Sequence, residues 1–180
     1  MPVIRVADLL DPRLREQLVT TLAAELQSEA GSNSGAEPVV YENPISPTAR
    51  FIAIVVWSRW GAVPWGARTG LILEAYQRAD AAQPHSSPRA PHLATASGLT
   101  WDEADDNGLF KFKIEPLTRE GELDPAAVRK AMIDAGAYET SGELRLRFLT
   151  LDSAKTAFAR LQNALPHAHW SIAAMIRNQE

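Results

Sequence analysis

The sequence predicts an α+β protein of two parts, an N-terminal α-β-β-α-β part over residues 1–107 and a C-terminal β-α-β-α-β unit over residues 108–180. The N-terminal part is organised around an unbroken apolar run from Phe51 to Trp57, which is typical of a strand covered on both faces. Apolar residues at helical spacing come next, so we expect a helix that packs back on this strand. A new alternation of apolar and charged residues begins at Phe110 and marks the second part. The sequence leaves open whether the two parts pack as one body.

The composition is that of a globular protein, with 22% charged residues and 46% from the AVILMFWYC set in a chain of 180 residues. A net charge of -4 argues against a generally basic protein that coats nucleic acid. The absence of cysteine excludes disulfides, thiolate metal sites and cysteine nucleophiles within the chain. No apolar stretch reaches the ~20 residues of a spanning helix, so we expect a cytoplasmic protein with no membrane contact.

The first helix is predicted to begin at Asp11 and Pro12, because aspartate is a good N-cap and proline suits the first helical position. Leucines then recur every four residues as far as Leu26. A short strand follows over residues 39–42, and the prolines within 43–48 predict a turn before the central strand.

The helix after the central strand is predicted from its apolar stripe of Ile72, Ala75, Tyr76 and Ala79. Gly66 and Gly70 lie four residues apart at its start, where each glycine costs about 1 kcal/mol relative to alanine. We expect a close approach of helix to strand at these glycines. Phosphate binding at this helix start is the alternative, although neither GxGxxG nor GxxxxGK[ST] is present.

Prolines predict a loop over residues 80–91, and a weak strand follows over 92–97. Thr100 and Glu103 then form a capping box, which predicts a short helix. The acidic residues of this helix, with Asn107 and Gly108 after them, are interpreted as a helix start and a turn. We expect the domain boundary at this turn.

The C-terminal unit begins with a half-buried strand, because Phe110, Phe112 and Ile114 alternate with charged residues. A helix follows from Asp124 and ends at Gly136. Residues 140–142 are predicted to turn the chain into a second half-buried strand. A helix and a last strand over residues 170–176 complete the unit.

Four segments of the N-terminal part share the features of one family. IAIVVWSRW places a basic and an aromatic residue after a valine-rich strand, and RTGLILEAY starts a helix with a basic residue. VVYENPIS and HLATASGLTWDEA stand where a first and a last strand belong. In order and spacing these segments, within residues 11–104, resemble the BolA family or a related KH-like arrangement. The resemblance implies a non-catalytic adaptor that docks a protein partner.

The sequence departs from that family at its ligand positions. Thr69 stands where the family has a histidine at the helix start, and the loop over residues 44–49 holds neither histidine nor cysteine. Only His92 matches a histidine that the family uses when it shares an iron–sulfur cluster with a monothiol glutaredoxin. We therefore expect no cofactor.

Trp60 and Trp65, with Arg59 and Arg68, are the candidate partner-binding residues, because aromatic and arginine side chains of this density are typical of docking surfaces. Binding of a nucleobase is a further use of such a group. The alternative is that Trp57 and Trp60 complete the core and that Trp65 only supports the helix start.

A second candidate surface consists of Lys111, Lys113, Arg145 and Arg147, which share one face if their strands belong to one sheet. Such a basic face predicts contact with nucleic-acid phosphates. The alternative is a solvated face, since the neighbouring aromatic residues are expected to point into the core.

His167 and His169 supply half of a metal site, and no second pair at a defined spacing completes it, so we expect no metal. No nucleophile motif such as G-x-S-x-G is present. The leading hypothesis is a non-enzymatic binding or adaptor protein whose protein partner and oligomeric state the sequence does not specify. Nucleic-acid binding is the alternative, and an enzyme with an unfamiliar site is the third hypothesis.

Overall fold

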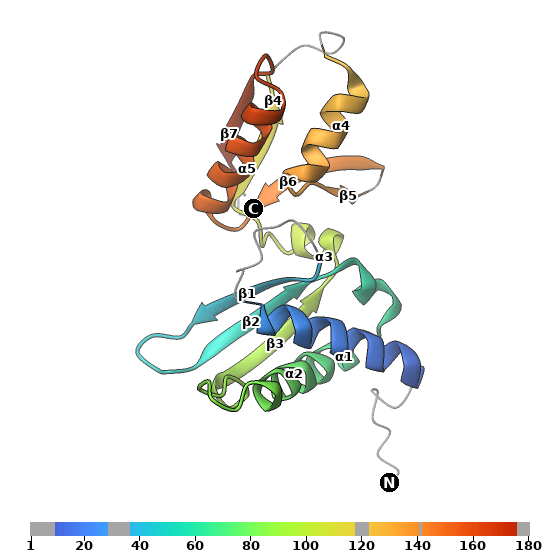
Figure 1. The fold of residues 1–180 in the computed structure, drawn as a ribbon, viewed down its shortest axis with the longest axis vertical. Coiled ribbons are helices and arrows are strands. Elements are labelled where there is room, and N and C mark those ends of the chain that lie inside the picture. Colours follow the sequence, from blue (N-terminus) through green and yellow to red (C-terminus); the bar gives the residue numbers. More distant parts are fainter. Residues whose placement is uncertain (1–9, 29–36, 118–122, 141, 176–180) are drawn as a thin grey trace, which may run out of the picture. The chain divides into compact units, whose positions relative to one another are not determined.

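The structure is a computed structural model that describes residues 10–28, 37–117, 123–140 and 142–175. It contains two compact units, of which the first ends at Thr100 and the second begins at Trp101 (Figure 1). Both units combine helices with a sheet, which confirms the α+β class predicted from the sequence.

The N-terminal unit has the α-β-β-α-β order that the sequence predicts, with two short 3-10 turns added. Its strands form a three-stranded sheet in the order β1-β2-β3, so β2 is central; β1 is antiparallel to β2 and β3 is parallel to it. The parallel pair is possible because the helix between β2 and β3 forms the crossover. The elements are α1 (Pro12–Gln27), β1 (Val39–Pro44), β2 (Phe51–Val56), η2 (Ser58–Ala62), α2 (Trp65–Ala82), η3 (Ala90–His92) and β3 (Leu93–Leu99).

The core of this unit lies between the sheet and the pair α1 and α2, which run side by side on one face of it (Figure 1). Ala53 and Val55 point from β2 into this core and are fully buried. Ile52 and Ile54 point to the other face and are half-buried. The expectation of a strand covered on both faces is therefore corrected for Ile52 and Ile54, because the two helices cover only one face of the sheet. Val56, at the end of the second face, is fully buried.

The start of α1 follows from the predicted cap. The Asp11 carboxylate accepts hydrogen bonds from the backbone N–H groups of Arg13 at 2.8 Å and Leu14 at 3.1 Å. These bonds satisfy two of the amides that a helix start leaves without partners. The buried stripe that follows consists of Leu18, Val19, Leu22, Ala23 and Leu26.

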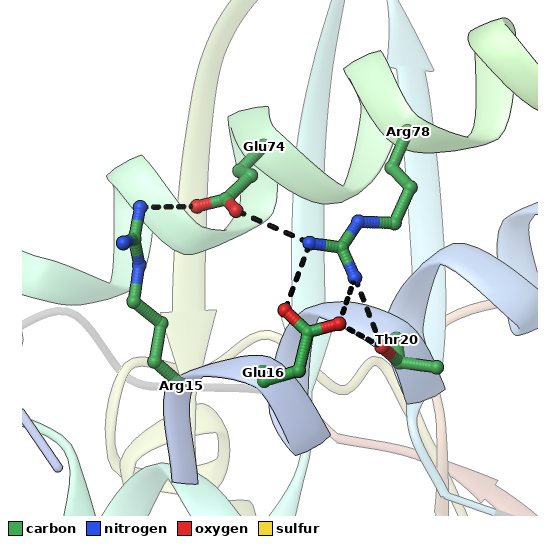
Figure 2. Close-up of polar contacts among 5 residues, drawn as sticks. All are labelled: Arg15, Glu16, Thr20, Glu74 and Arg78. Atoms are coloured by element: carbon green, nitrogen blue, oxygen red, sulfur yellow. Dashed lines mark hydrogen bonds and ion pairs between the residues drawn. The ribbon is translucent and has the colours of Figure 1, made fainter. Parts of the chain in front are cut away.

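Charged side chains join the outer surfaces of α1 and α2. Figure 2 shows Arg78 donating to Glu16 at 2.6 Å and to Thr20 at 2.9 Å, while Arg15 donates to Glu74 at 2.6 Å. The hydrogen bond from Arg78 lowers the pKa of Glu16 below its ordinary value. Because these groups are exposed, they contribute little to stability, and the buried stripe accounts for the helix packing.

The predicted close approach at Gly70 is wrong. Gly70 is exposed, and a Cβ atom added there would meet no atom within 4 Å. The close approach occurs instead at Gly98 in β3, where an added Cβ would lie 2.9 Å from Trp60 Cε2 and 3.0 Å from Arg68 Cβ. Thr69 makes the polar contact from this turn of α2 to the sheet, donating to the Ala96 carbonyl at 2.9 Å.

The C-terminal unit contains one more strand than the sequence predicts. Its order after the first helix is β-α-β-β-α-β, because residues 138–140 pair with the next strand before the chain turns at Gly142, whose φ is 79°. Three residues are too few to show an alternating pattern in the sequence. The elements are α3 (Trp101–Asp106), β4 (Phe112–Pro116), α4 (Pro125–Asp134), β5 (Tyr138–Thr140), β6 (Glu143–Phe148), α5 (Leu151–Ala164) and β7 (Trp170–Ala174).

The four strands form an antiparallel sheet in the order β5-β6-β4-β7. This order and the position of the two helices define a ferredoxin-like arrangement. Both α4 and α5 pack on one face, against Ile114, Leu146 and Trp170. Asp124 caps α4 by accepting from the Ala126 N–H at 3.1 Å, as its sequence predicts.

The helix α3 belongs to the C-terminal unit, whereas the sequence predicts these residues within the N-terminal part. The ring of Trp101 stacks on that of Tyr138, with 4.3 Å between centroids, and on that of Phe110 at 5.9 Å. These contacts, rather than the turn at Asn107 and Gly108, determine to which unit α3 belongs. The boundary between the units therefore falls between Thr100 and Trp101.

Candidate docking site at the start of α2

The four residues predicted to bind a partner divide into two exposed and two buried side chains. Trp65 is 59% exposed and Arg59 is also exposed, whereas Trp60 is 0% and Arg68 6% exposed. Only Trp65 and Arg59 therefore have surface with which to contact another molecule. Trp60 and Arg68 act beneath them.

Trp60 is a core residue, as the alternative interpretation held. Its ring meets that of Trp57 edge to face, with 5.5 Å between centroids and an angle of 82°. Its Nε1–H donates to the Val55 carbonyl at 3.0 Å, so the polar end of the buried indole is satisfied. Both tryptophans belong to the core between the sheet and the helices.

Arg68, near the start of α2, binds the segment that precedes this helix and the end of β3. Its guanidinium donates to the carbonyls of Val63 at 3.1 Å, Gly98 at 3.0 Å and Trp60 at 2.9 Å. A guanidinium presents its donors in a planar fork, which suits three acceptors held in different directions. The arginine thereby connects α2 to the end of β3 and to residues 60–63.

The same guanidinium supports the exposed tryptophan. The Arg68 Cζ atom lies 5.0 Å from the centre of the Trp65 ring, within the range of a cation–π contact. Arg59 makes a similar contact with Trp57 at 5.6 Å. We call Trp65 and Arg59, with the Arg68 and Trp57 side chains beneath them, the Trp65 patch. Its exposed aromatic ring rests on a buried group that is itself held by three hydrogen bonds.

Three of the four predicted basic residues of the C-terminal unit lie on strands of one sheet, and Lys111 directly precedes β4, but each of the four has a partner. Lys113 lies opposite Arg147 in the register of β4 and β6. Arg145 donates to Asp105 at 2.9 Å, and Arg147 forms an ion pair with the same carboxylate. Burial lowers the pKa of Arg147.

The two lysines of this group bind locally. Lys113 pairs with Glu115 at 2.5 Å, and Lys111 Nζ donates to the Gly108 carbonyl at 3.1 Å. The sequence predicts Asp105 only as part of a helix and a turn and does not reveal its role as a counter-ion. Nothing in the local sequence indicates a partner 40 residues away.

A second polar cluster of the N-terminal unit was also missed. The hydroxyl of Tyr76 donates to Glu42 Oε1 at 2.5 Å, and Arg89 forms an ion pair with the same carboxylate. Arg89 also lies over the Tyr76 ring, with Cζ 5.3 Å from its centre, and donates to the Leu26 carbonyl at 3.1 Å. Burial, and then the hydrogen bond to Glu42, raise the pKa of Tyr76.

Replacing Tyr76 with phenylalanine should lower the free energy of unfolding at pH 7 by about 1–2 kcal/mol, because Glu42 loses a buried donor. The raised pKa makes this contribution complete below the ordinary value of 10.0 and lost as the pH rises through the folded-state pKa. Urea unfolding from pH 7 to 11 should show a shallower decline in the variant than in the wild type above pH 10. Parallel declines would contradict the assignment.

A shallow depression of about 350 Å³ lies beside this cluster, lined by Gln77, Asp80, Pro88, Ala90 and Pro91. Its one carboxylate is occupied by the backbone, because Asp80 accepts from the N–H groups of Arg89 at 3.0 Å and Ala90 at 2.8 Å. This geometry shapes the turn before β3. It gives no support to the third hypothesis, that of an enzyme.

The histidines considered as ligands in the sequence all lie at the surface. His167 and His169 are exposed just before β7, and His92 is exposed in η3. The described part of the chain holds no group of three or more histidine, aspartate or glutamate side chains arranged to bind a metal ion. Nor is any helix in that part both long and apolar enough to cross a bilayer.

Comparison of the chain with family models, curated proteins and solved structures found no match.

Proposed function

We propose that the chain is a non-enzymatic, cytoplasmic binding protein that docks a protein partner through the Trp65 patch. The observation that carries this proposal is the 59% exposure of Trp65 above the buried, hydrogen-bonded guanidinium of Arg68. Tryptophan and arginine are the residues most enriched among those that dominate binding energy at protein interfaces. The α-β-β-α-β order of the N-terminal unit also suits the adaptor role that the BolA-like or KH-like resemblance implies.

The support beneath the ring favours tight docking. A side chain that is already held in one position loses less conformational entropy when a partner covers it. Arg59, the other exposed side chain of the patch, carries a positive charge. The chemistry of the patch therefore suits a partner with an apolar pocket for the indole and a carboxylate for the guanidinium.

Replacing Trp65 with alanine should weaken partner binding by about 30-fold or more, the effect expected for a central aromatic anchor. Partners recovered by wild-type protein from a cell lysate would be identified by mass spectrometry, and the affinity of each purified partner would then be measured by calorimetry. Leu73 provides the matched control, since it is also an apolar residue of α2 and is 40% exposed. Leu73→Ala should bind as the wild type does.

Two outcomes would contradict the proposal. Equal affinity of the Trp65→Ala and wild-type proteins would remove the Trp65 patch from partner binding. Equal losses in the Trp65→Ala and Leu73→Ala proteins would show that the effect is not specific to the patch. Thermal melting of each variant excludes unfolding as the cause.

A further inference from the structure

The sheet of the C-terminal unit has one face covered by α4 and α5 and a second face occupied by α3. The helices α4 and α5 pack on the face that carries Ile114 and Leu146. Lys113 and Arg147 are paired across β4 and β6, so both point to the opposite face, as do Arg145 and Tyr138, which are paired across β5 and β6. Asp105 and Trp101 of α3 contact side chains of this second face.

An ion-pair cluster and an aromatic stack both join α3 to this face. The Asp105 carboxylate, only 10% exposed, receives Arg145 at 2.9 Å and forms an ion pair with Arg147. Trp101 lies almost parallel to Tyr138, with 12° between the rings and 4.3 Å between their centroids. A planar ring and an anion are thus bound side by side, the ring on an aromatic platform and the anion between two guanidinium groups.

We propose that this face is a binding site for single-stranded nucleic acid and that α3 is an intramolecular cover that the strand displaces. A nucleotide presents the same two features as α3, a planar base and a phosphate. Arginine forks match phosphate oxygens, and four-stranded sheets of this arrangement bind single-stranded RNA by stacking its bases on aromatic residues. The base takes the place of the Trp101 ring on Tyr138, and a phosphate takes the place of the Asp105 carboxylate.

The exchange is chemically balanced. Both guanidinium groups keep an anionic partner in this exchange, and Arg145 also retains its ion pair with Glu143. The cover is a helix of only six residues, which is too short to be stable without its contacts. It is followed by Gly108 in a left-handed conformation, φ 65°, where the chain reverses before β4.

Nucleic acid fits this face better than an acidic peptide does. A peptide carboxylate could replace Asp105, but acidic side chains offer no ring to replace Trp101. Phe110 lies 5.8 Å from Tyr138 and extends the aromatic platform. Lys113 on β4, beside Arg147 on β6, adds a cation for a second phosphate, which would replace its half-exposed partner Glu115. This site uses other residues and another unit than the Trp65 patch, so it stands or fails independently of the proposed function.

The test measures fluorescence anisotropy of labelled single-stranded oligothymidine and oligouridine, each 20 nucleotides long, on addition of the full chain. Asp105→Asn weakens the cover and should bind both strands about 10-fold or more tightly than the wild type does. The affinity should fall steeply as salt rises. Asp102→Asn is the matched control, because Asp102 is an exposed residue of the same helix and its loss changes the net charge equally. It should bind as the wild type does.

A second set of variants identifies the surface. Adding Arg145→Gln and Arg147→Gln to the Asp105→Asn protein should abolish the gain. Competition with polyglutamate distinguishes nucleic acid from a general anion, and it should displace the strands only weakly. The proposal is overturned if Asp105→Asn binds no more tightly than Asp102→Asn, if the arginine changes leave the gain intact, or if polyglutamate competes as well as unlabelled strands do.

Hydrogen exchange on the wild-type chain tests displacement without any variant. At saturating oligothymidine, the backbone amides of residues 102–107 should exchange at least several-fold faster than without it, because the strand has removed α3 from the sheet. Unchanged or slower exchange there would overturn the proposal even if the Asp105→Asn protein failed to fold.

Discussion

Replacing Arg68 with methionine is expected to lower the free energy of unfolding by about 3–5 kcal/mol, a loss at the upper end of single substitutions. The methionine fills the volume of the arginine stem but donates no hydrogen bond. Three carbonyls, those of Trp60, Val63 and Gly98, would lose their donor in a buried site. Each such loss costs on the order of 1–3 kcal/mol, with some relief from relaxation.

Two further arginine variants separate the hydrogen bonds from the charge. Arg68→Lys keeps the charge, but its compact ammonium cannot reach all three acceptors, so we expect a loss of about 2 kcal/mol. Arg59→Met removes an exposed arginine that makes one cation–π contact and should cost less than about 1 kcal/mol. Urea unfolding of the full chain measures all three. An Arg68→Met midpoint equal to that of Arg59→Met would contradict the role assigned to Arg68.

Replacing Gly98 with alanine should lower the free energy of unfolding by about 2–3 kcal/mol, because the site has no room for a methyl group. The added Cβ would lie 2.9 Å from Trp60 Cε2 and 3.0 Å from Arg68 Cβ. Neither neighbour moves easily, since Trp60 is bound to the Val55 carbonyl and Arg68 to three others. The strain therefore falls on the packing of α2 against β3.

Gly70→Ala is the matched control for this substitution. Gly70 is an exposed helical residue with open space around its Cα, so alanine should stabilise the chain by about 0.5–1 kcal/mol. In a Trp60→Phe background, the cost of Gly98→Ala should fall, because the smaller ring leaves room for the methyl group. Destabilisation by Gly98→Ala that is unchanged in that background would show that Trp60 is not the obstacle.

Short-range patterns in the sequence determined the elements. The Asp11 and Asp124 caps form with amides two or three residues away, so the residues that define these helix starts are neighbours in the chain. The seven apolar residues from Phe51 are long enough to indicate the central strand, and the alternation of Phe110, Phe112 and Ile114 indicates the strand β4. The strand begins only at Phe112, because Phe110 stacks on Trp101 and Tyr138 instead. The three-residue strand β5 lacked such a pattern and was missed.

The candidate sites depend on contacts between distant segments, which only the tertiary structure decided. Trp60 and Trp65 look equivalent in sequence, yet one is buried and the other exposed, because the turn into α2 directs them differently. Asp105 pairs with arginines 40 and 42 residues away, and Glu42 pairs with Arg89 at a separation of 47.

The same distinction explains the two glycines. A glycine's cost within a helix is a local property, so Gly70 could be recognised as unfavourable from the sequence. The space available for a Cβ atom depends on which side chains from other segments fold against it, and at Gly98 these are Trp60 and Arg68. Local backbone preferences and apolar periodicity are set by neighbouring residues, whereas ion pairs, burial and close approach are set by the packing of the whole unit.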